Sequence, residues 1–314
     1  MTLNTNLIEK LEKITSKSAI AAYNFIGKND KMAADKAAVD VMRKELNNLD
    51  IKGKVVIGEG ELDEAPMLYI GEQVGSGHGL HVDIAVDPVE GTNFVAKNLP
   101  GGLSVLAVSE KGNLFNAPET YMEKIAVGSD VPQGLLDLDY SVKENIKRLA
   151  KAKCKDIKSI VACILDRPRH LKIIEELMDI GVSVKLISDG DVAGALLVSD
   201  QKYNVDIYLG TGGGPEGVLA AAALDAYGCK FQCRFLFEND EDIRRAKKMG
   251  ISDLNKKYNL HEIIKGDTIF CATGITNGDL VNGVTFKNNK FYTETLVTHK
   301  NSSNRIIKSE TSKT

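Results

Sequence analysis

Apolar and polar positions alternate with the period of an α-helix through the first 50 residues. A first apolar stripe recurs at steps of three, four or seven residues and consists of Leu7, Leu11, Ile14, Ala21 and Phe25. Gly27 ends this run, and Asp30 is placed to cap a second helix. The stripe of that second helix consists of Ala34, Ala38, Val41, Met42 and Leu46. The pattern predicts two amphipathic helices.

Short apolar runs typical of strands follow at Lys54–Ile57, His81–Val86 and Leu103–Val108. The segments between them are rich in Gly, Pro and Asn, which favour turns. Helices followed by such strands are typical of an α+β lobe with a mixed or antiparallel sheet. We expect this lobe to occupy residues 1–150.

Beyond residue 155, three short apolar strands are each followed by a helical stretch. The strand segments read SIVACIL, SVKLI and VDIYL, and the helical ones read RHLKIIEELMDIG, DVAGALLVS and EGVLAAAALDAYG. This β-α order predicts an open parallel sheet with right-handed crossovers. The expected fold class is therefore α/β, with an α/β lobe over residues 151–314. We expect the basic run 143–158 to be a solvated helix and connector, and the tail NSSNRIIKSETSKT to fray.

The composition narrows the class of protein. With 314 residues and a net charge of −3, the chain lacks the basic excess of a dedicated nucleic-acid binder. Its apolar runs fall short of a membrane span, and its N-terminus is polar, unlike a signal peptide. The five cysteines are scattered and odd in number, which argues against a disulfide framework. We therefore expect a cytoplasmic protein with no nucleic-acid or membrane partner.

Acidic residues are concentrated between Glu59 and Glu90, where eight carboxylates occur without a Lys or Arg. Four of them, Glu61, Asp63, Glu64 and Glu72, are expected on a solvated surface. Asp87 and Glu90 differ, because they follow a buried strand and are separated by a Pro88 turn that ends at Gly91. Their spacing lets both carboxylates point to one side, where their oxygens would suit Mg²⁺ or Mn²⁺. An ordinary capped turn is the alternative.

Basic and glycine-rich segments follow the three predicted parallel strands. Arg167 and Arg169 lie where a phosphate would meet guanidinium groups and free backbone N–H groups at a helix start. Asp189 and Asp191 follow the next strand and suit hydrogen bonds to sugar hydroxyls. Glycines 212–214 would let the backbone approach a ligand. Open α/β sheets bind ligands at these strand ends, although each segment alone is also compatible with a simple turn and helix cap.

Several long motifs resemble known phosphatases. IGEGELDEAPMLYIGE and DIAVDPVEGTN are similar to the metal-dependent, lithium-sensitive sugar and inositol phosphatases, whose signature is D-P-x-[DE]-G-T. In chain order, GKNDKMAADKAAV, NAPETYMEK, PRH, SDGDVA, GTGGGPEGV and CATGITNGD resemble the class II fructose-1,6-bisphosphatases. The resemblance extends from about residue 15 to about residue 298. It implies a layered αβαβα sugar-phosphatase fold.

The resemblance also implies an activity and a set of site residues. The reaction would be hydrolysis of the 1-phosphate of fructose 1,6-bisphosphate to fructose 6-phosphate, a step of gluconeogenesis, with two or three Mg²⁺ or Mn²⁺ ions. The implied metal ligands are Asp35, Glu59, Asp87, Glu90 and Glu216. The implied substrate contacts are Glu90, Gly91, Thr92, Tyr121, Arg167, Pro168, Arg169, Asp189, Gly190, Asp191 and Gly213. The implied catalytic residues are Asp35, Thr92 and Glu90, of which the first two would help to activate the attacking water.

The roles of several candidate site residues stay open. Asp35 could act mainly as a ligand or mainly as a base, and His170 could contact substrate or only its neighbours. Tyr121 would be a core aromatic in most chains, so its place at the site rests on the resemblance alone. Arg167 stands where the family often has Lys, which could alter phosphate geometry. The resemblance implies a homo-oligomer, either a dimer or a tetramer.

The substrate is also open among related possibilities. The chain could prefer sedoheptulose 1,7-bisphosphate, accept both sugar bisphosphates, or act on an inositol or nucleotide phosphate. It could also be a non-catalytic sugar-phosphate sensor. A sensor would be expected to have lost at least one metal ligand, and all five positions carry acids here.

Overall fold

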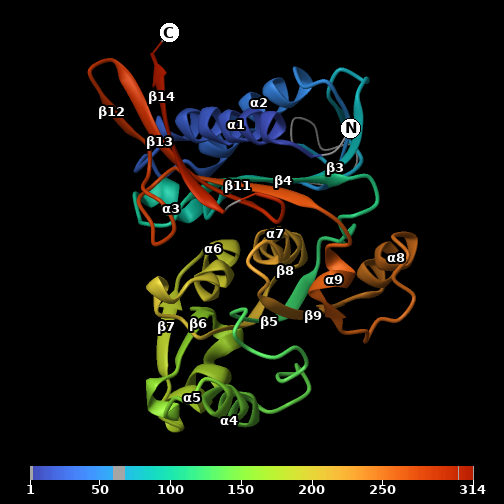
Figure 1. Cartoon of the computed structure of the whole chain (residues 1–314), viewed down its shortest axis with the longest axis vertical. Coiled ribbons are helices and arrows are strands. Elements are labelled where there is room, and N and C mark those ends of the chain that lie inside the picture. Colours follow the sequence, from blue (N-terminus) through green and yellow to red (C-terminus); the bar gives the residue numbers. More distant parts are fainter. Residues whose placement is uncertain (1–2, 59–67, 303, 314) are drawn as a thin grey trace. The chain divides into compact units, whose positions relative to one another are not determined.

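The computed structural model describes residues 3–58, 68–302 and 304–313. The chain forms two compact units, unit 1 (Met1–Phe115 and Ile264–Thr314) and unit 2 (Asn116–Ile263). This division differs from the expected boundary after residue 150. The reason is that the strand Thr268–Gly274 returns to pair antiparallel with Leu103–Glu110, so the C-terminal segment joins the first sheet. Figure 1 shows the red C-terminal strands beside the blue and teal N-terminal elements within unit 1.

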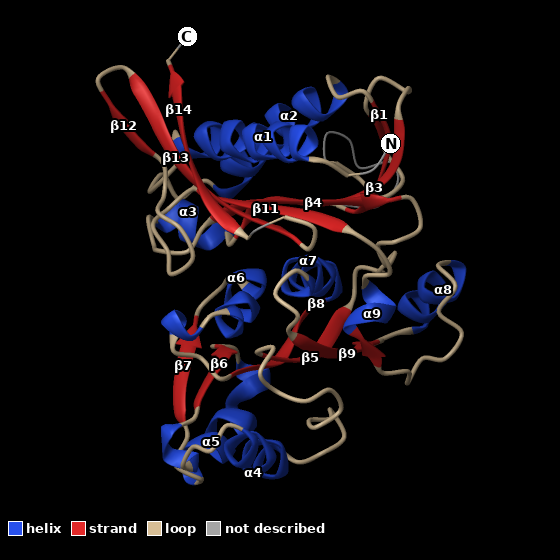
Figure 2. Cartoon of the chain, viewed as in Figure 1, coloured by secondary structure: helices blue, strands red, loops and turns tan. Residues whose placement is uncertain are grey.

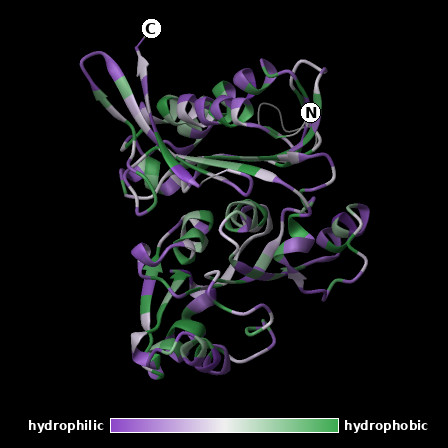
Figure 3. Cartoon of the chain, in the orientation of Figure 1, coloured by the Kyte–Doolittle hydropathy of each residue, from purple (hydrophilic) through white to green (hydrophobic). Residues whose placement is uncertain are grey.

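Unit 1 begins with the two predicted helices. Helix α1 spans Thr5–Tyr23 and helix α2 spans Lys31–Asn47. The Asp30 carboxylate accepts a hydrogen bond from the Ala33 N–H at 2.9 Å, which confirms the expected cap. Figure 3 shows green apolar and purple polar segments alternating along α1, as the sequence pattern requires. Both helices cover one face of the sheet in this unit (Figure 2).

The sheet of unit 1 has eight strands in the described residues, in the order β12-β13-β11-β4-β3-β1-β2, with β14 on β13. Their bounds are β1 Ile51–Ile57, β2 Gln73–Val74, β3 Leu80–Glu90, β4 Leu103–Glu110, β11 Thr268–Gly274, β12 Thr285–Lys287, β13 Lys290–His299 and β14 Arg305–Ser312. The pair β1–β3 is parallel and the β3–β4 pair is antiparallel, so the predicted mixed sheet is confirmed. The short helix α3 (Thr92–Lys97) follows β3.

The C-terminal tail was expected to fray, but most of it forms a paired strand. Strand β14 pairs antiparallel with β13 along its whole length. The Ser309 hydroxyl on β14 also donates to the buried Glu12 carboxylate of α1 at 2.8 Å. Ladder and side-chain hydrogen bonds therefore order a segment whose polar composition suggested a loose end.

Unit 2 is built on a mixed sheet ordered β10-β9-β5-β8-β6-β7. Its strands are β5 Tyr121–Val127, β6 Val161–Leu165, β7 Ser183–Ile187, β8 Ile207–Gly213, β9 Lys230–Leu236 and β10 Tyr258–Asn259. Its α-helices are α4 Val142–Ala152, α5 Leu171–Asp179, α6 Asp191–Leu196, α7 Gly214–Asp225, α8 Asp240–Lys248 and α9 Leu260–Ile263. Helices α4 and α5 lie on one face of this sheet, and α6 and α7 lie on the other (Figures 1 and 2).

The predicted β-α units are confirmed on one side of the sheet of unit 2, where β8, β6 and the edge strand β7 are parallel. Strand β5 is antiparallel to both β8 and β9, so the whole sheet is mixed. The basic run 143–158 belongs to this unit and is not a connector. Ile146 and Leu149 on α4 are fully buried in its core, because the apolar stripe of the helix packs inward while its lysines face water.

Both units thus combine helices with sheets, which places the chain in the α/β class. Among the helices in the described part of the chain, none has the length and apolar character needed to cross a membrane.

Candidate active site

Two carboxylates of unit 1 lie at the end of β3, where the strand carries a β-bulge. Asp87 lies opposite Val105 of β4, and Glu90 lies opposite Leu103, so three steps on β3 match two steps on β4. Residues two apart on a strand share one face, whereas residues three apart normally do not. The extra residue of the bulge therefore brings Asp87 and Glu90 to the same face of the sheet.

That face is the one opposite α1 and α2. Ile84 and Val86 of β3 belong to the hydrophobic core to which these two helices contribute. Because side chains alternate along a strand, Asp87 is directed to the other side. Glu90 is buried, with 4% of its surface exposed, and Asp87 is partly exposed. The two acids form one acidic position at the end of β3.

The turn after β3 is fixed by its backbone. The Asp87 carboxylate accepts a hydrogen bond from the Val89 N–H at 3.1 Å, so the capped turn that the sequence left as an alternative is present. Gly91 has φ +77°, and a Cβ built there would lie 2.6 Å from the Phe94 ring. Only glycine fits this position without strain, and Thr92 then begins α3.

Asp35 lies on α2, which packs against both β3 and α3. Ala34, next to it, shares a small hydrophobic cluster with Val89 of β3 and Val95 of α3. Asp35 therefore lies next to a residue of α2 that packs in one cluster with Val89 and Val95, which flank Thr92 in the sequence. Among the proposed ligands, Glu59 lies outside the described residues, and Glu216 belongs to unit 2.

The donor chemistry of unit 1 fits the expected cations. Asp87 and Glu90 offer only carboxylate oxygens, the donors that Mg²⁺ and Mn²⁺ prefer. Within the described residues, however, no group of three or more His, Cys, Asp or Glu side chains is gathered closely enough to hold a metal ion. The expected convergence of five carboxylates therefore stays a prediction.

Unit 2 brings three predicted segments to one end of its parallel strands. Residues 167–169 follow β6, residues 189–191 follow β7, and residues 213–216 span the end of β8 and the start of α7. Arg167 donates to the Ser188 carbonyl and to the Asp189 carboxylate, the latter at 3.3 Å. These contacts link the first two segments directly.

Arg169 is oriented without an acidic partner. Its Nε donates to the Thr211 carbonyl at 2.9 Å, and its guanidinium lies 4.8 Å from the centroid of the Tyr121 ring. In the described part of the chain, no carboxylate lies within ion-pair distance of Arg169. Tyr121 is 41% exposed, so it is not the core aromatic that its residue type alone would favour.

His170 is a structural residue of this site. Its Nε2 accepts a hydrogen bond from the Thr211 N–H at 2.8 Å, which leaves Nδ1 to donate to the Leu165 carbonyl at 2.7 Å. Burial lowers its pKa and favours the neutral imidazole that this pair of bonds requires. Both ring nitrogens are thus used within the protein, and the alternative in which His170 only joins its neighbours fits better.

Asp191 is enclosed by two donors that the sequence did not indicate. Its carboxylate accepts from the Lys124 Nζ and from the Tyr208 hydroxyl, and Asp191 and Lys124 are 7% and 1% exposed. A buried carboxylate needs such partners to offset the loss of hydration. The one available signal was a lysine at a β5 position between apolar Met122 and Ala126, on the face that is otherwise buried.

The glycines of the GTGGGPEG segment accommodate carboxylates of the protein itself. A Cβ on Gly212 would overlap the Asp191 carboxylate, and a Cβ on Gly213 would overlap the Glu216 carboxylate. Burial raises the pKa of Glu216, the charges of Asp191 and Asp189 add to that rise, and Lys124 opposes it. Glu216 is thus held against the loop by shape and lies near a positive charge.

Comparison with known proteins identifies the family. The sequence model of the family described as bacterial fructose-1,6-bisphosphatase, glpX-encoded, matches residues 5–311. The chain belongs to this family. The class 2 fructose-1,6-bisphosphatase of Haemophilus influenzae is 41% identical over 309 residues, covering 94% of this chain and 92% of that protein. The fructose-1,6-bisphosphatase 1 class 2 of Escherichia coli is 42% identical, covering 94% of this chain and 91% of that protein.

A solved structure with some similarity is the extragenic suppressor protein suhB of Bartonella henselae. It is 10% identical, covers 63% of this chain and 73% of its own, and has a TM-score of 0.36. That similarity is too weak to support an inference. The family match itself is strong, so the chain is an enzyme of the fructose-1,6-bisphosphatase family.

Tyr208→Phe tests the anchoring of Asp191 in this bisphosphatase-family chain. The substitution removes one hydroxyl donor from a buried carboxylate, and we expect the free energy of unfolding to fall by about 1.5–3 kcal/mol. Denaturant-induced unfolding measures this change. Tyr140→Phe is the matched control, because Tyr140 is 39% exposed, and its effect should stay below about 0.5 kcal/mol. Equal stability of the two variants would contradict the anchoring role.

Proposed function

We propose that the chain hydrolyses the 1-phosphate of fructose 1,6-bisphosphate to fructose 6-phosphate and phosphate. The family match over residues 5–311 carries this proposal. Two named class 2 fructose-1,6-bisphosphatases, each more than 40% identical over nearly the whole chain, support it. The site residues described above supply the chemistry that the reaction needs.

Asp87 and Glu90 are the proposed ligands that unit 1 contributes, and the family resemblance adds Asp35, Glu59 and Glu216. Two or three Mg²⁺ or Mn²⁺ ions, when bound, would supply Lewis-acid activation and neutralise the charge of the reacting phosphoryl group. The bulge supports this role for Asp87 and Glu90, because it directs two oxygen-donor side chains to one side of a rigid sheet.

Asp35 and Thr92 are the proposed residues that orient the attacking water, with Asp35 accepting its proton. The packing of α2 on α3 and β3 supports this pairing, since it fixes the helix that carries Asp35 against the segment that carries Thr92. Water would then attack the phosphorus atom in line with the bond to the sugar oxygen, this bond would break, and the sugar alkoxide would take up a proton from solvent. Gly91 supplies the left-handed backbone conformation from which α3 begins at Thr92.

Arg169, Tyr121 and Arg167 are proposed to bind the other phosphate of the substrate. The exposed Arg169 guanidinium, which has no acidic partner in the described residues, supports this role. Its Nη groups can form a bidentate pair with a phosphate while Nε stays on the Thr211 carbonyl. Asp189 and the backbone of Gly190 and Gly213 are the proposed contacts to the sugar, together with Pro168 and Asp191.

Arg169→Ala should raise KM more than it lowers kcat. A hydrogen-bonded contact to a charged group contributes about 1.5–3 kcal/mol, so we expect KM to rise by about 10- to 100-fold. The lost contact holds a phosphate that does not react, and it is therefore equally strong in the ground state and the transition state. Steady-state phosphate release checks this, and an unchanged KM would contradict the role of Arg169.

A substrate panel separates the proposed activity from its alternatives. Phosphate release is measured for fructose 1,6-bisphosphate, sedoheptulose 1,7-bisphosphate, an inositol monophosphate and a nucleoside monophosphate, each with Mg²⁺, Mn²⁺ or added Li⁺. We expect the highest kcat/KM for fructose 1,6-bisphosphate, activity only with a divalent cation, and inhibition by Li⁺. Binding of the sugar phosphates without release under any condition would instead favour a sensor.

Two further properties are proposed with the activity. We propose a homo-oligomer, a dimer or a tetramer, which sedimentation velocity tests directly. We also propose a cytoplasmic location, where sugar phosphates and reduced thiols are found, and fractionation of the producing cells tests it.

A further inference from the structure

Three neighbouring strands of unit 2 present a row of residues beside Arg169. Thr211 of β8 is the register partner of Glu123 on β5, and Glu123 is the register partner of Arg234 on β9. Register partners in a sheet point to the same face, with Cβ atoms about 4.5–5.5 Å apart. Tyr121 lies two residues before Glu123 and shares that face. The Glu123 carboxylate therefore belongs to the surface on which Arg169 rests.

Two contacts hold the Arg169 side chain on this surface. Its Nε is bonded to the Thr211 carbonyl, and its guanidinium lies over the Tyr121 ring. Glu123 is placed between these two contacts by the register, with 34% of its side chain exposed. A partly exposed carboxylate on the same surface as an arginine without an acidic partner would ordinarily pair with it.

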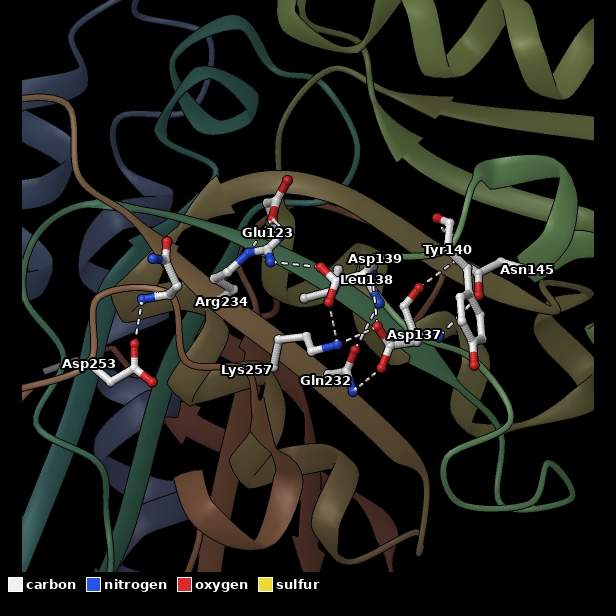
Figure 4. A network of polar contacts seen from close by, with 11 residues as sticks. Glu123, Asp137, Leu138, Asp139, Tyr140, Asn145, Gln232, Arg234, Asp253 and Lys257 are labelled. Atoms are coloured by element: carbon white, nitrogen blue, oxygen red, sulfur yellow. Dashed lines mark hydrogen bonds and ion pairs between the residues drawn. The ribbon is translucent and has the colours of Figure 1, made fainter.

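Arg234 already binds that carboxylate. Its Nε and Nη2 donate to Glu123 Oε2 at 3.0 and 2.7 Å, and its Nη1 donates to Asp139 at 2.8 Å. Lys257 in turn donates to Asp139 at 2.6 Å and to Asp137 at 2.5 Å. Figure 4 shows Arg234 between Glu123 and Asp139, with Lys257 beside both aspartates. Arg234 is therefore fixed at both sides of its guanidinium.

We propose that Arg234 is a positioning residue that holds Glu123 away from Arg169 and so keeps the Arg169 charge available for a substrate phosphate. The proposal rests on the phosphate-binding role of Arg169 given above. It assigns to Arg234 an effect on substrate binding although Arg234 itself does not contact the substrate. Arg234 and Arg169 would compete for the Glu123 carboxylate. Arg234 donates two hydrogen bonds to one of its oxygens, and this favours the pair with Arg234.

Kinetics of Arg234→Gln test the proposal with fructose 1,6-bisphosphate as the probe. Released from Arg234, Glu123 pairs with Arg169, and we expect KM to rise about two- to fivefold with kcat unchanged, the size typical of a part-exposed ion pair. Lys257→Gln removes the same charge from the network but leaves the Arg234–Glu123 pair intact, and its KM should stay within about twofold of wild type.

Two double variants separate this effect from a merely structural one. Glu123→Gln combined with Arg234→Gln should restore the wild-type KM, since the competing carboxylate is then absent. In an Arg169→Gln background, Arg234→Gln should change KM no further, because the target of Glu123 is gone. Arg234→Lys keeps the charge beside Glu123 and should have a KM near wild type, even if Arg234→Gln folds poorly.

Specific results would overturn the proposal. One is an unchanged KM in Arg234→Gln. A second is a raised KM that persists when Glu123→Gln is added. The third is an equal rise in KM when Arg234→Gln is made in the wild-type protein and in the Arg169→Gln background. If Arg169→Gln alone leaves KM at the wild-type value, the phosphate-binding role of Arg169 fails first, and the inference about Arg234 fails with it. A normal Arg169 effect together with an inert Arg234→Gln overturns the inference alone.

Discussion

Asp87→Ala should lower kcat for fructose 1,6-bisphosphate by about 10³-fold or more, since metal-assisted charge stabilisation contributes several kcal/mol and each 1.36 kcal/mol is a factor of ten. The substitution removes one of the two carboxylates that the β3 bulge places on the same face. The fold should persist, because the Asp87 side chain is partly exposed and does not belong to the hydrophobic core that β3 forms with α1 and α2. Phosphate release measures the first effect and circular dichroism the second.

Asp83→Asn is the matched control for Asp87→Ala. Asp83 lies on the same strand and accepts a hydrogen bond from the Gly112 N–H at 2.6 Å, which an asparagine oxygen can also accept. Its activity should stay within about twofold of wild type, as expected for a change outside the site. Near-normal turnover by a folded Asp87→Ala protein would remove Asp87 from the proposed ligands.

Gly213→Ala should lower kcat by about 10²-fold, the cost typical of displacing a catalytic group by about 1 Å. Gly213 has φ −67° and ψ 146°, a conformation that alanine adopts without strain. The added methyl group would overlap the Glu216 carboxylate, the end of a flexible side chain, so this carboxylate must move. The variant thus displaces Glu216 without changing its chemistry, and thermal unfolding should show a fold close to wild type.

A double variant shows whether the Gly213→Ala effect passes through Glu216. In a Glu216→Ala background there is no carboxylate to displace, and Gly213→Ala should cost little further activity. Full additivity of the two losses would place the effect elsewhere, for example in a direct approach of the Gly213 backbone to the substrate. Wild-type activity of Gly213→Ala would argue against any role for the position of Glu216.

Local periodicity was enough to predict the elements that frame both parts of the proposed site. The apolar stripe predicted from Leu7 to Phe25 lies on α1 up to Ala21, since the helix ends at Tyr23, and Asp30 caps α2 as expected. The alternation of short apolar strands and helical stretches predicted the parallel β6, β7 and β8. Since ligand-binding segments follow the carboxyl ends of such strands, the positions of Arg167 and Asp189 at one edge could be predicted as well.

Pairings between distant segments could not be predicted in this way. The period of residues 268–274 indicates a strand but does not say that it pairs with β4, and this pairing decides the division into two units. The same holds for β14, whose polar sequence resembles a loose tail until its partner β13 is known. Register between strands depends on tertiary packing, which local sequence does not record.

The partners of the charged side chains are tertiary features of the same kind. Asp191 begins α6, whereas its two donors lie on strands, Lys124 on β5 and Tyr208 on β8. Nothing near Asp191 in the sequence indicates that they donate to its carboxylate. The two bonds that fix the His170 ring likewise come from the separate residues Leu165 and Thr211. Sequence motifs therefore predicted which residues carry charge at the site, whereas the structure was needed to see what holds each of them.

We propose that this chain removes the 1-phosphate of fructose 1,6-bisphosphate in a reaction that depends on divalent cations. The most direct test strips the purified protein of metal and then measures both products after Mg²⁺ or Mn²⁺ is returned. Equal amounts of fructose 6-phosphate and phosphate are expected with either or both cations, and none after chelation. Formation of fructose 1-phosphate, release that chelation does not affect, or no release with either cation would contradict it.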